Sequence, residues 1–119
     1  VTTVPADAKS DKELKIIVDV SNVPILAGKP GPMYIWTWKP NDPPAGNGAW
    51  ENSNEALKMT KESDNIWSFT MTPTTFYNKS ANAITEIQFL VKEKVYGILL
   101  KWGVSDISRV PKNRHKEIL

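Results

Sequence analysis

Apolar and polar residues alternate along much of the chain, and clusters of proline, glycine and asparagine interrupt the alternation. A period of two is typical of a β-strand that buries one face. The pattern predicts strands over residues 14–20, 33–39, 55–60, 66–71, 84–92 and 95–104. Residues 61–65 are predicted to be a hairpin turn, and Thr72 and Pro73 suit the start of one helical turn over 72–78.

Short strands, frequent turns and the lack of a long amphipathic helix indicate an all-β protein. We predict an immunoglobulin-like antiparallel β-sandwich of about six to eight strands, with a small OB-like barrel as the alternative. The proline- and glycine-rich segment 21–32 is predicted to be a loop or a crossing between sheets. The 119 residues suffice for one core. They divide into a flexible linker (1–11), one sandwich domain (12–104) and a C-terminal segment (105–119).

The predicted strand over 33–39, with the sequence MYIWTWK, is rich in aromatic residues. In an extended chain, alternate side chains point to opposite faces. One face carries Tyr34, Trp36 and Trp38. The other face carries Met33, Ile35 and Thr37. Either face can be the buried one, so the aromatic row is part of the core or an exposed platform, and the pattern leaves both interpretations open.

The other tryptophans differ in their surroundings. Trp67 and Trp102 alternate in step with apolar neighbours, so we expect both in the core, where aromatic side chains bury large areas. Trp50 instead follows the irregular loop 41–48, which contains two prolines, two glycines and two asparagines. Long irregular loops often carry function, and Trp50 is expected to lie beside the aromatic row.

Composition narrows the classes of partner. The formal net charge is only +2, whereas a nucleic-acid-binding surface is normally more basic and more clustered. The absence of cysteine excludes disulfides, thiolate metal sites and a cysteine nucleophile. No apolar run approaches the roughly 20 residues that span a bilayer. Any membrane contact is expected only through an N-terminal anchor outside this chain.

The sequence lacks the motifs of familiar enzymes, and we predict no catalytic activity, no cofactor and no metal site. It has no glycine-rich phosphate loop, no HExxH helix, no GxSxG elbow and no calcium loop. The only histidine, His115, is expected to be a solvated tail residue. A glycosidase needs two suitably spaced carboxylates, but the acidic residues fall on turns and strand exteriors. We interpret the following as surface groups: Asp42, Glu51, Glu55, Glu62, Asp64 and Glu86.

An exposed aromatic row would be a contiguous apolar patch, and such patches usually mark a binding surface. The C–H groups on the face of a sugar ring pack flat on an indole, while its hydroxyls need polar partners. Lys39 and Asn47 are near in sequence to supply them, as are Asn41 and Glu51. Stacking of this kind predicts weak binding, in the range of about 10 µM to 1 mM.

The segments MYIWTW, GAW, LKM and NIWSFTM, within residues 14–92, resemble those of small starch-binding sandwich modules of amylases. They are also similar to domains of outer-membrane polysaccharide-utilisation lipoproteins of gut Bacteroidetes. The resemblance implies a non-catalytic module that binds a polysaccharide such as an α-glucan at the bacterial cell surface or in the periplasm. The residues it implies are Tyr34 and Trp36 or Trp38 as the strand platform, Trp50 as the loop partner, and Lys39 or Asn47 as the polar contact.

Two other interpretations fit the sequence. A ligand-free immunoglobulin-like spacer or interaction domain of a bacterial surface protein would use all five tryptophans structurally. An OB-like nucleic-acid binder would stack bases on the aromatic strand and contact phosphates with the basic tail. Lysine and arginine are sparse around residues 34–50, so no nucleic-acid partner is predicted. The pattern predicts no particular oligomeric state.

Overall fold

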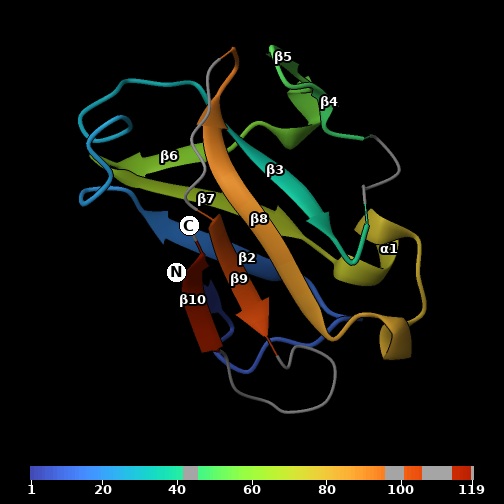
Figure 1. Cartoon of the computed structure of the whole chain (residues 1–119). Coiled ribbons are helices and arrows are strands. Elements are labelled where there is room, and N and C mark those ends of the chain that lie inside the picture. The colour runs from blue at the N-terminus through green and yellow to red at the C-terminus, as the bar shows by residue number, and fades with distance from the viewer. Residues whose placement is uncertain (42–45, 96–100, 106–113, 119) are drawn as a thin grey trace.

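The protein is an antiparallel β-sandwich. The computed structural model describes residues 1–41, 46–95, 101–105 and 114–118. Within these ranges two four-stranded sheets pack against each other, and a separate two-stranded hairpin lies beside them (Figure 1). The predicted all-β sandwich is therefore confirmed. The described strands pair within each sheet and not between the two, which differs from the barrel alternative.

The first sheet has the strand order β1-β2-β7-β6. Its strands are β1 (Thr2–Val4), β2 (Leu14–Asp19), β7 (Ile66–Met71) and β6 (Thr60–Ser63). β2 and β7 pair antiparallel over their whole length, from Leu14↔Met71 to Asp19↔Ile66. The predicted alternation holds in β2, where Leu14, Ile16 and Val18 are buried and face the second sheet.

The second sheet has the order β10-β9-β8-β3. Its strands are β10 (Arg114–Ile118), β9 (Lys101–Ser105), β8 (Glu86–Glu93) and β3 (Met33–Lys39). β3 is an edge strand, and unpaired edges invite non-native pairing. Here the edge is partly covered, because the Met59 N–H donates to the Met33 carbonyl at 2.8 Å and Tyr34 forms an isolated bridge with Lys58.

Short elements connect the sheets. They are the hairpin of β4 (Gly48–Ala49) and β5 (Asn52–Ser53), the 3₁₀ helices η1 (Glu55–Leu57) and η2 (Ala81–Ala83), and the helix α1 (Pro73–Tyr77). The predicted helical turn over 72–78 is confirmed as α1. Thr72 is its N-cap residue in an extended conformation and Pro73 lies in its first turn, where a missing N–H is harmless.

The core lies between the sheets and settles which face of β3 is buried. Met33, Ile35 and Thr37 are fully buried, and the first two belong to the main hydrophobic cluster. Trp67 and Trp102 are also buried there, as predicted. The aromatic face of β3 is therefore the outer face of the second sheet. Its indoles pack only at the margin of the core.

Both ends of the chain contribute more structure than the sequence predicted. Within the predicted linker, Thr2–Val4 pairs with β2 through the contacts Thr2↔Ile17 to Val4↔Lys15, so the linker prediction is wrong for these residues. Two threonines and a valine suit an extended edge strand. In the C-terminal segment, β10 pairs with β9. This strand was not predicted because its charged sequence, RHKEI, lacks the alternation of apolar and polar residues. The side chain of His115 and the part of the predicted strand over 96–100 lie outside the described residues.

The predicted strand over 55–60 is wrong. The Asn54 side chain accepts a hydrogen bond from the Ala56 N–H at 3.3 Å and caps η1, as asparagine favours. Leu57 and Met59 are nevertheless both buried because Lys58 between them is extended. The strand β6 begins only at Thr60 and runs into the predicted turn 61–65. A hairpin with β7 does form, but its first strand is Thr60–Ser63 and its turn is 64–65, not the predicted 55–60 and 61–65.

Gly31 makes the crossing from β2 to β3 intolerant of any side chain. Its φ is +85°, and a Cβ atom there would overlap the indole of Trp67. We expect Gly31→Ala to lower the free energy of unfolding by about 3 kcal/mol, from left-handed strain and overpacking. Gly28→Ala is the control, since Gly28 has φ +75° with nothing within 4 Å of a Cβ. The free energy of unfolding of Gly28→Ala should fall by only about 1 kcal/mol. Equal losses in urea denaturation would contradict the packing argument.

Candidate functional site

The β4–β5 hairpin packs against the outer face of β3 and brings Trp50 next to Trp36. Trp50 and Glu51 form the two-residue turn between β4 and β5. The Trp36 and Trp50 rings lie 5.1 Å apart between centroids, with an interplanar angle of 81°. This is an edge-to-face arrangement, which aromatic pairs favour. We call the two indoles the aromatic corner.

The aromatic corner is only partly covered. Trp50 is 36% exposed, and Trp36 is half-buried against the core margin. Isolated exposed apolar residues need no explanation, but here two large rings share one surface. The structure thus brings together two of the predicted platform residues, which lie fourteen positions apart in the sequence.

Next along β3, Trp38 is half-buried and has polar side chains beside it. Its indole Nε1 donates to Gln88 Oε1 at 3.1 Å, and Gln88 Nε2 donates to Glu86 Oε2 at 3.4 Å. Lys39, which is exposed as predicted for a polar contact, pairs with Glu86 at 3.3 Å. We call Lys39, Glu86 and Gln88 the polar margin. Its groups are fixed in position at the surface.

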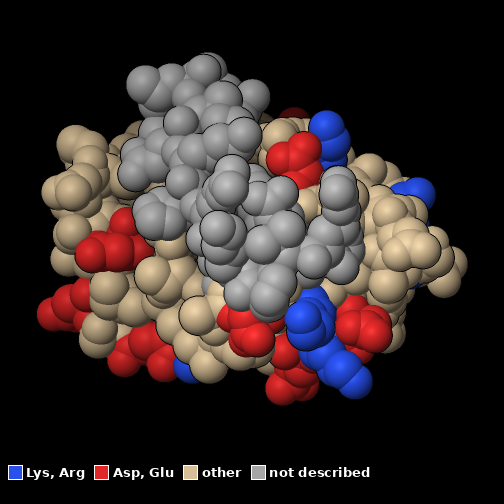
Figure 2. Space-filling view, turned by 90° about the horizontal axis from the view of Figure 1, so that it is seen from below, with Lys and Arg blue, Asp and Glu red and all other residues tan. Residues whose placement is uncertain are grey.

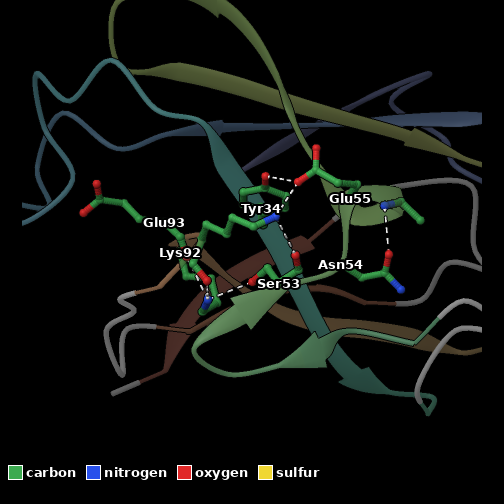
Figure 3. Close-up of polar contacts among 8 residues, drawn as sticks. Tyr34, Ser53, Asn54, Glu55, Lys92 and Glu93 are labelled. Carbon is green, nitrogen blue, oxygen red and sulfur yellow. Dashed lines mark hydrogen bonds and ion pairs between the residues drawn. The ribbon is translucent and has the colours of Figure 1, made fainter.

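Tyr34 does not offer its ring to a ligand. It is 1% exposed, its hydroxyl donates to Glu55 Oε2, and the Lys94 ammonium lies 5.2 Å above its ring centroid. Figure 3 shows the phenol directed at Glu55 of η1. The prediction that Tyr34 belongs to an exposed platform is therefore wrong. η1 and the end of β8 cover this end of the aromatic row.

Asn47 is a structural residue and not an exposed polar contact. It is 6% exposed. Its Oδ1 accepts from the Thr37 N–H at 3.1 Å and its Nδ2 donates to the Thr37 carbonyl at 2.7 Å. An amide side chain thus takes the place of a neighbouring strand at the edge of β3. The predicted ligand contact is replaced by this role because the edge would otherwise hold unpaired backbone groups.

Lys92 is the main feature that the sequence did not predict. It is 0% exposed, and its Nζ donates to Ser53 Oγ at 2.7 Å, to the Glu93 carbonyl at 2.7 Å and to the Lys94 carbonyl at 2.9 Å. Figure 3 shows Lys92 reaching Ser53 on the hairpin. Burial lowers the pKa of Lys92, Glu51 opposes this shift and Lys94 adds to it.

A signal for Lys92 existed in the alternation of β8. Ile87, Phe89 and Val91 are buried in the core and alternate with Gln88, Leu90 and Lys92, and this period of two places Lys92 on the opposite face of the strand. The pairing Tyr34↔Lys92 sets it beside the aromatic face of β3. That pairing joins residues far apart in the chain, and a single sequence does not encode it in any local pattern.

A second charged group fastens η1 to the sheet. Lys94 Nζ lies 2.6 Å from Glu55 Oε2. The hydrogen bonds from Lys94 and then Tyr34 lower the pKa of Glu55, and Glu55 in turn raises the pKa of Lys94. For Tyr34, burial is the larger cause and the Glu55 carboxylate the next in raising its pKa. Glu55 was predicted to be a simple surface group. It is exposed, but its carboxylate binds both Lys94 and Tyr34.

We expect the Glu55 carboxylate to make stability depend on acid. Because its folded-state pKa lies below the ordinary value of 4.5, its contribution is present above that pH and lost as the pH falls through the lowered pKa. Glu55→Gln should therefore be less stable than the wild type at pH 7 and lose less stability below about pH 4.5. Some acid sensitivity remains, since Ser68 and Lys15 lower the pKa of Glu62.

Urea denaturation between neutral and acid pH tests this expectation. Asp64→Asn is the control, because Asp64 is 95% exposed in its pair with Lys61 at 3.7 Å, and exposed pairs contribute little. The control should follow the wild-type profile. A Glu55→Gln profile that is parallel to the wild type would contradict the assignment.

Among the described residues no three His, Cys, Asp or Glu side chains come together to hold a metal, and none of the helices in those ranges is long and apolar enough to cross a membrane. A groove of about 370 Å³ lies beside β7 and α1. It is lined by Ala56, Phe69, Thr70, Met71, Thr72, Thr75 and Phe76. It contains none of the predicted site residues.

Comparison with known protein families and with curated proteins finds no match to this chain. Functional arguments must therefore start from the aromatic corner and its surroundings. The arrangement offers an indole surface of two angled rings, a third indole with a fixed N–H, and carboxylate, amide and ammonium groups at its margin. Such a surface is suited to bind a ligand with both apolar faces and hydroxyl groups.

Proposed function

We propose that this domain is a non-catalytic carbohydrate-binding module that recognises a polysaccharide by aromatic stacking. The observation that carries the proposal is the exposed indole of Trp50, held edge-to-face against Trp36. Both rings lie on the outer side of the second sheet, where Trp36 packs at the margin of the core and is not one of its buried residues. The core is built from other residues, so the two indoles are not needed to fill it.

The angle between the rings supports an α-glucan as the ligand class. Perpendicular indoles present a corner and not a flat strip. A helically curved α-linked chain turns its successive sugar faces, whereas a flat β-linked chain presents them in one plane. Stacking one sugar on an indole buries about 100 Å² and contributes about 2.5 kcal/mol. After the costs of association, binding in the range of about 10 µM to 1 mM is expected.

The polar margin supplies the hydroxyl partners in this proposal. Lys39 keeps its predicted role, and Gln88 and Glu86 take the place of Asn47, whose amide bonds the backbone of Thr37. Along β3, Trp38 lies between Trp36 of the aromatic corner and Lys39 of the polar margin. Its Nε1 donates a hydrogen bond to Gln88, which fixes its position. Sugar hydroxyls both donate and accept hydrogen bonds, so a margin with both kinds of group suits them.

The lysines near the corner are poorly placed for nucleic-acid phosphates. Lys92 is buried, while Lys94 pairs with Glu55 and Lys39 with Glu86. Figure 2 views the molecule from below, the side away from the β4–β5 hairpin at the top of Figure 1, and both acidic and basic side chains lie on the described residues of that face. A stacking surface for bases normally lies in a basic groove. Because the lysines near the aromatic corner are buried or paired with carboxylates, its surroundings favour a neutral ligand.

A bacterial surface or periplasmic location is part of the proposal and rests on the sequence resemblance alone. The same holds for attachment through an N-terminal anchor outside this chain. The competing function, a ligand-free spacer or interaction domain, predicts that no sugar changes the environment of any tryptophan. The two proposals therefore differ in one direct measurement.

The experiment is a titration of the whole domain with maltoheptaose, cellohexaose and mannohexaose, followed by tryptophan fluorescence and calorimetry. We expect a saturable change with maltoheptaose and a weaker one or none with the two β-linked sugars. Saturation by cellohexaose alone would retain carbohydrate binding and overturn the α-glucan assignment. If none of the sugars changes either signal up to several millimolar, the carbohydrate proposal is wrong and the spacer function is favoured.

A further inference from the structure

The hairpin that carries Trp50 is too small to hold its own position. Each of its strands has two residues, paired as Gly48↔Ser53 and Ala49↔Asn52. Isolated two-stranded hairpins are at best marginally stable even when longer. The place of Trp50 must therefore be set by contacts that tie the hairpin to the sheet.

Ser53 is the point where these contacts converge on β8. Its N–H donates to the Lys94 carbonyl at 3.1 Å, its Oγ accepts from Lys92 Nζ at 2.7 Å, and its carbonyl accepts from Lys94 Nζ at 3.3 Å. Of these links, only the one from Lys92 also reaches the two indoles. The Lys92 ammonium lies 5.7 Å from the ring centroid of Trp36 and 5.0 Å from that of Trp50.

The geometry around Lys92 matches an ammonium group. Its three N–H donors meet three oxygen acceptors, and both indoles lie within the roughly 6 Å at which cation–π attraction acts. A neutral amine would have one donor fewer and would turn a lone pair toward one of the oxygens. The charge is thus fully used, although it is shielded from water.

Global stability alone is a poor reason for this charge. Removing an ion from water is costly, and well-packed apolar replacements of buried charges are often neutral for stability. The lowered pKa of Lys92, which burial causes, points the same way. Because folding depresses this pKa, the charged form is disfavoured in the folded state at neutral pH relative to the unfolded chain.

We propose that Lys92 is the positioning residue of the aromatic corner: its ammonium holds the β4–β5 hairpin through Ser53 and sets Trp50 at its angle to Trp36. The proposal rests on the proposed function for its effect on sugar binding. Its effect on the position of Trp50 does not depend on any ligand.

Lys92→Met tests the proposal, because methionine keeps much of the apolar stem and removes the charge and the donors. The readout is the set of five indole N–H signals in ¹H–¹⁵N NMR spectra, assigned with single Trp→Phe variants. We expect the signals of Trp36 and Trp50 to move, since each loses the field and the ring current of its partner. Those of Trp67 and Trp102 should keep their positions.

Lys61→Met is the matched control. Lys61 also lies over an indole, at 5.8 Å from the ring centroid of Trp67, but it belongs to the first sheet. This variant should leave the Trp36 and Trp50 signals unchanged. If Lys92→Met folds, changes of similar size in all five indole signals would show a general structural role and overturn the proposal, as would an unmoved Trp50 signal.

Sugar binding gives the second readout. Lys92→Met should bind maltoheptaose about tenfold more weakly, which is about 1.4 kcal/mol, and Lys61→Met should bind as the wild type does. If the wild type binds no sugar, the proposed function fails while the indole signals still decide the role of Lys92. Should Lys92→Met not fold, Ser53→Ala removes the hairpin end of the contact. It must then move the same two signals, and unmoved signals overturn the proposal.

Discussion

Trp50→Ala is expected to weaken sugar binding by more than about 50-fold while the domain stays folded. Loss of one stacked surface of about 100 Å² removes about 2.5 kcal/mol, a decrease in affinity of more than 50-fold on the scale of about 1.4 kcal/mol per tenfold. From a starting Kd between about 10 µM and 1 mM, this loss raises the Kd to about 0.5 mM or higher. Calorimetry and fluorescence titration with maltoheptaose measure the change.

Stability should change much less in the same variant. Trp50 is 36% exposed at a hairpin tip, so its removal loses mainly the edge-to-face contact with Trp36, which is worth about 1 kcal/mol. Trp50→Phe keeps an aromatic face and should retain part of the affinity. If Trp50→Ala binds maltoheptaose as the wild type does, the aromatic corner is not the site.

Local patterns were sufficient for most of the fold. The alternation of Leu14, Ile16 and Val18 in β2 and of Trp67 and Phe69 in β7 reports the same physical fact, that one face of a strand is buried. It also identified the two faces of β3. The alternation failed over 55–60. There Leu57 ends the 3₁₀ helix η1, Lys58 is extended, and Met59 is buried, as is Leu57. In the sequence, two apolar residues separated by one polar residue fit the end of a strand as well as they fit a short turn capped by asparagine.

The site was less predictable because its geometry depends on long-range pairing. That Trp36 and Trp50 would be near each other was expected because only the loop 41–48 separates Trp50 from the aromatic strand. The sequence did not predict which groups would cover Tyr34, because Lys94 and Glu55 are 39 positions apart. Lys92 and Ser53 are separated by 39 positions as well. Their meeting depends on the register of β3 against β8, which no local motif sets.

Asn47 shows that sequence patterns also fail to predict contacts between residues close together in the chain. Its position in a polar loop beside an aromatic strand suggested a ligand contact, and it directly precedes the hairpin that carries Trp50. Among the described strands β3 is the edge of its sheet, and the Asn47 side chain binds the backbone of Thr37 on that edge instead. A short polar residue in a loop serves either purpose, and only the location of the sheet edge decides between them.

Asn47→Ala is therefore expected to destabilise the whole domain. The substitution leaves the buried N–H and carbonyl of Thr37 without their partners, and each unsatisfied group costs about 1 to 3 kcal/mol. We expect the free energy of unfolding to fall by about 4 kcal/mol, measured by urea denaturation. Asn47→Asp should also lose stability, because a carboxylate oxygen would face the Thr37 carbonyl in place of a donor.

Asn41→Ala is the matched control for this prediction, since Asn41 lies in the same loop region and is exposed. It should unfold within about 0.5 kcal/mol of the wild type, as surface substitutions usually do. A ligand-contact role for Asn47 predicts the opposite pattern, with unchanged stability and weakened sugar binding. Wild-type stability in Asn47→Ala would show that the edge of β3 does not need this amide, and it would return Asn47 to the binding surface.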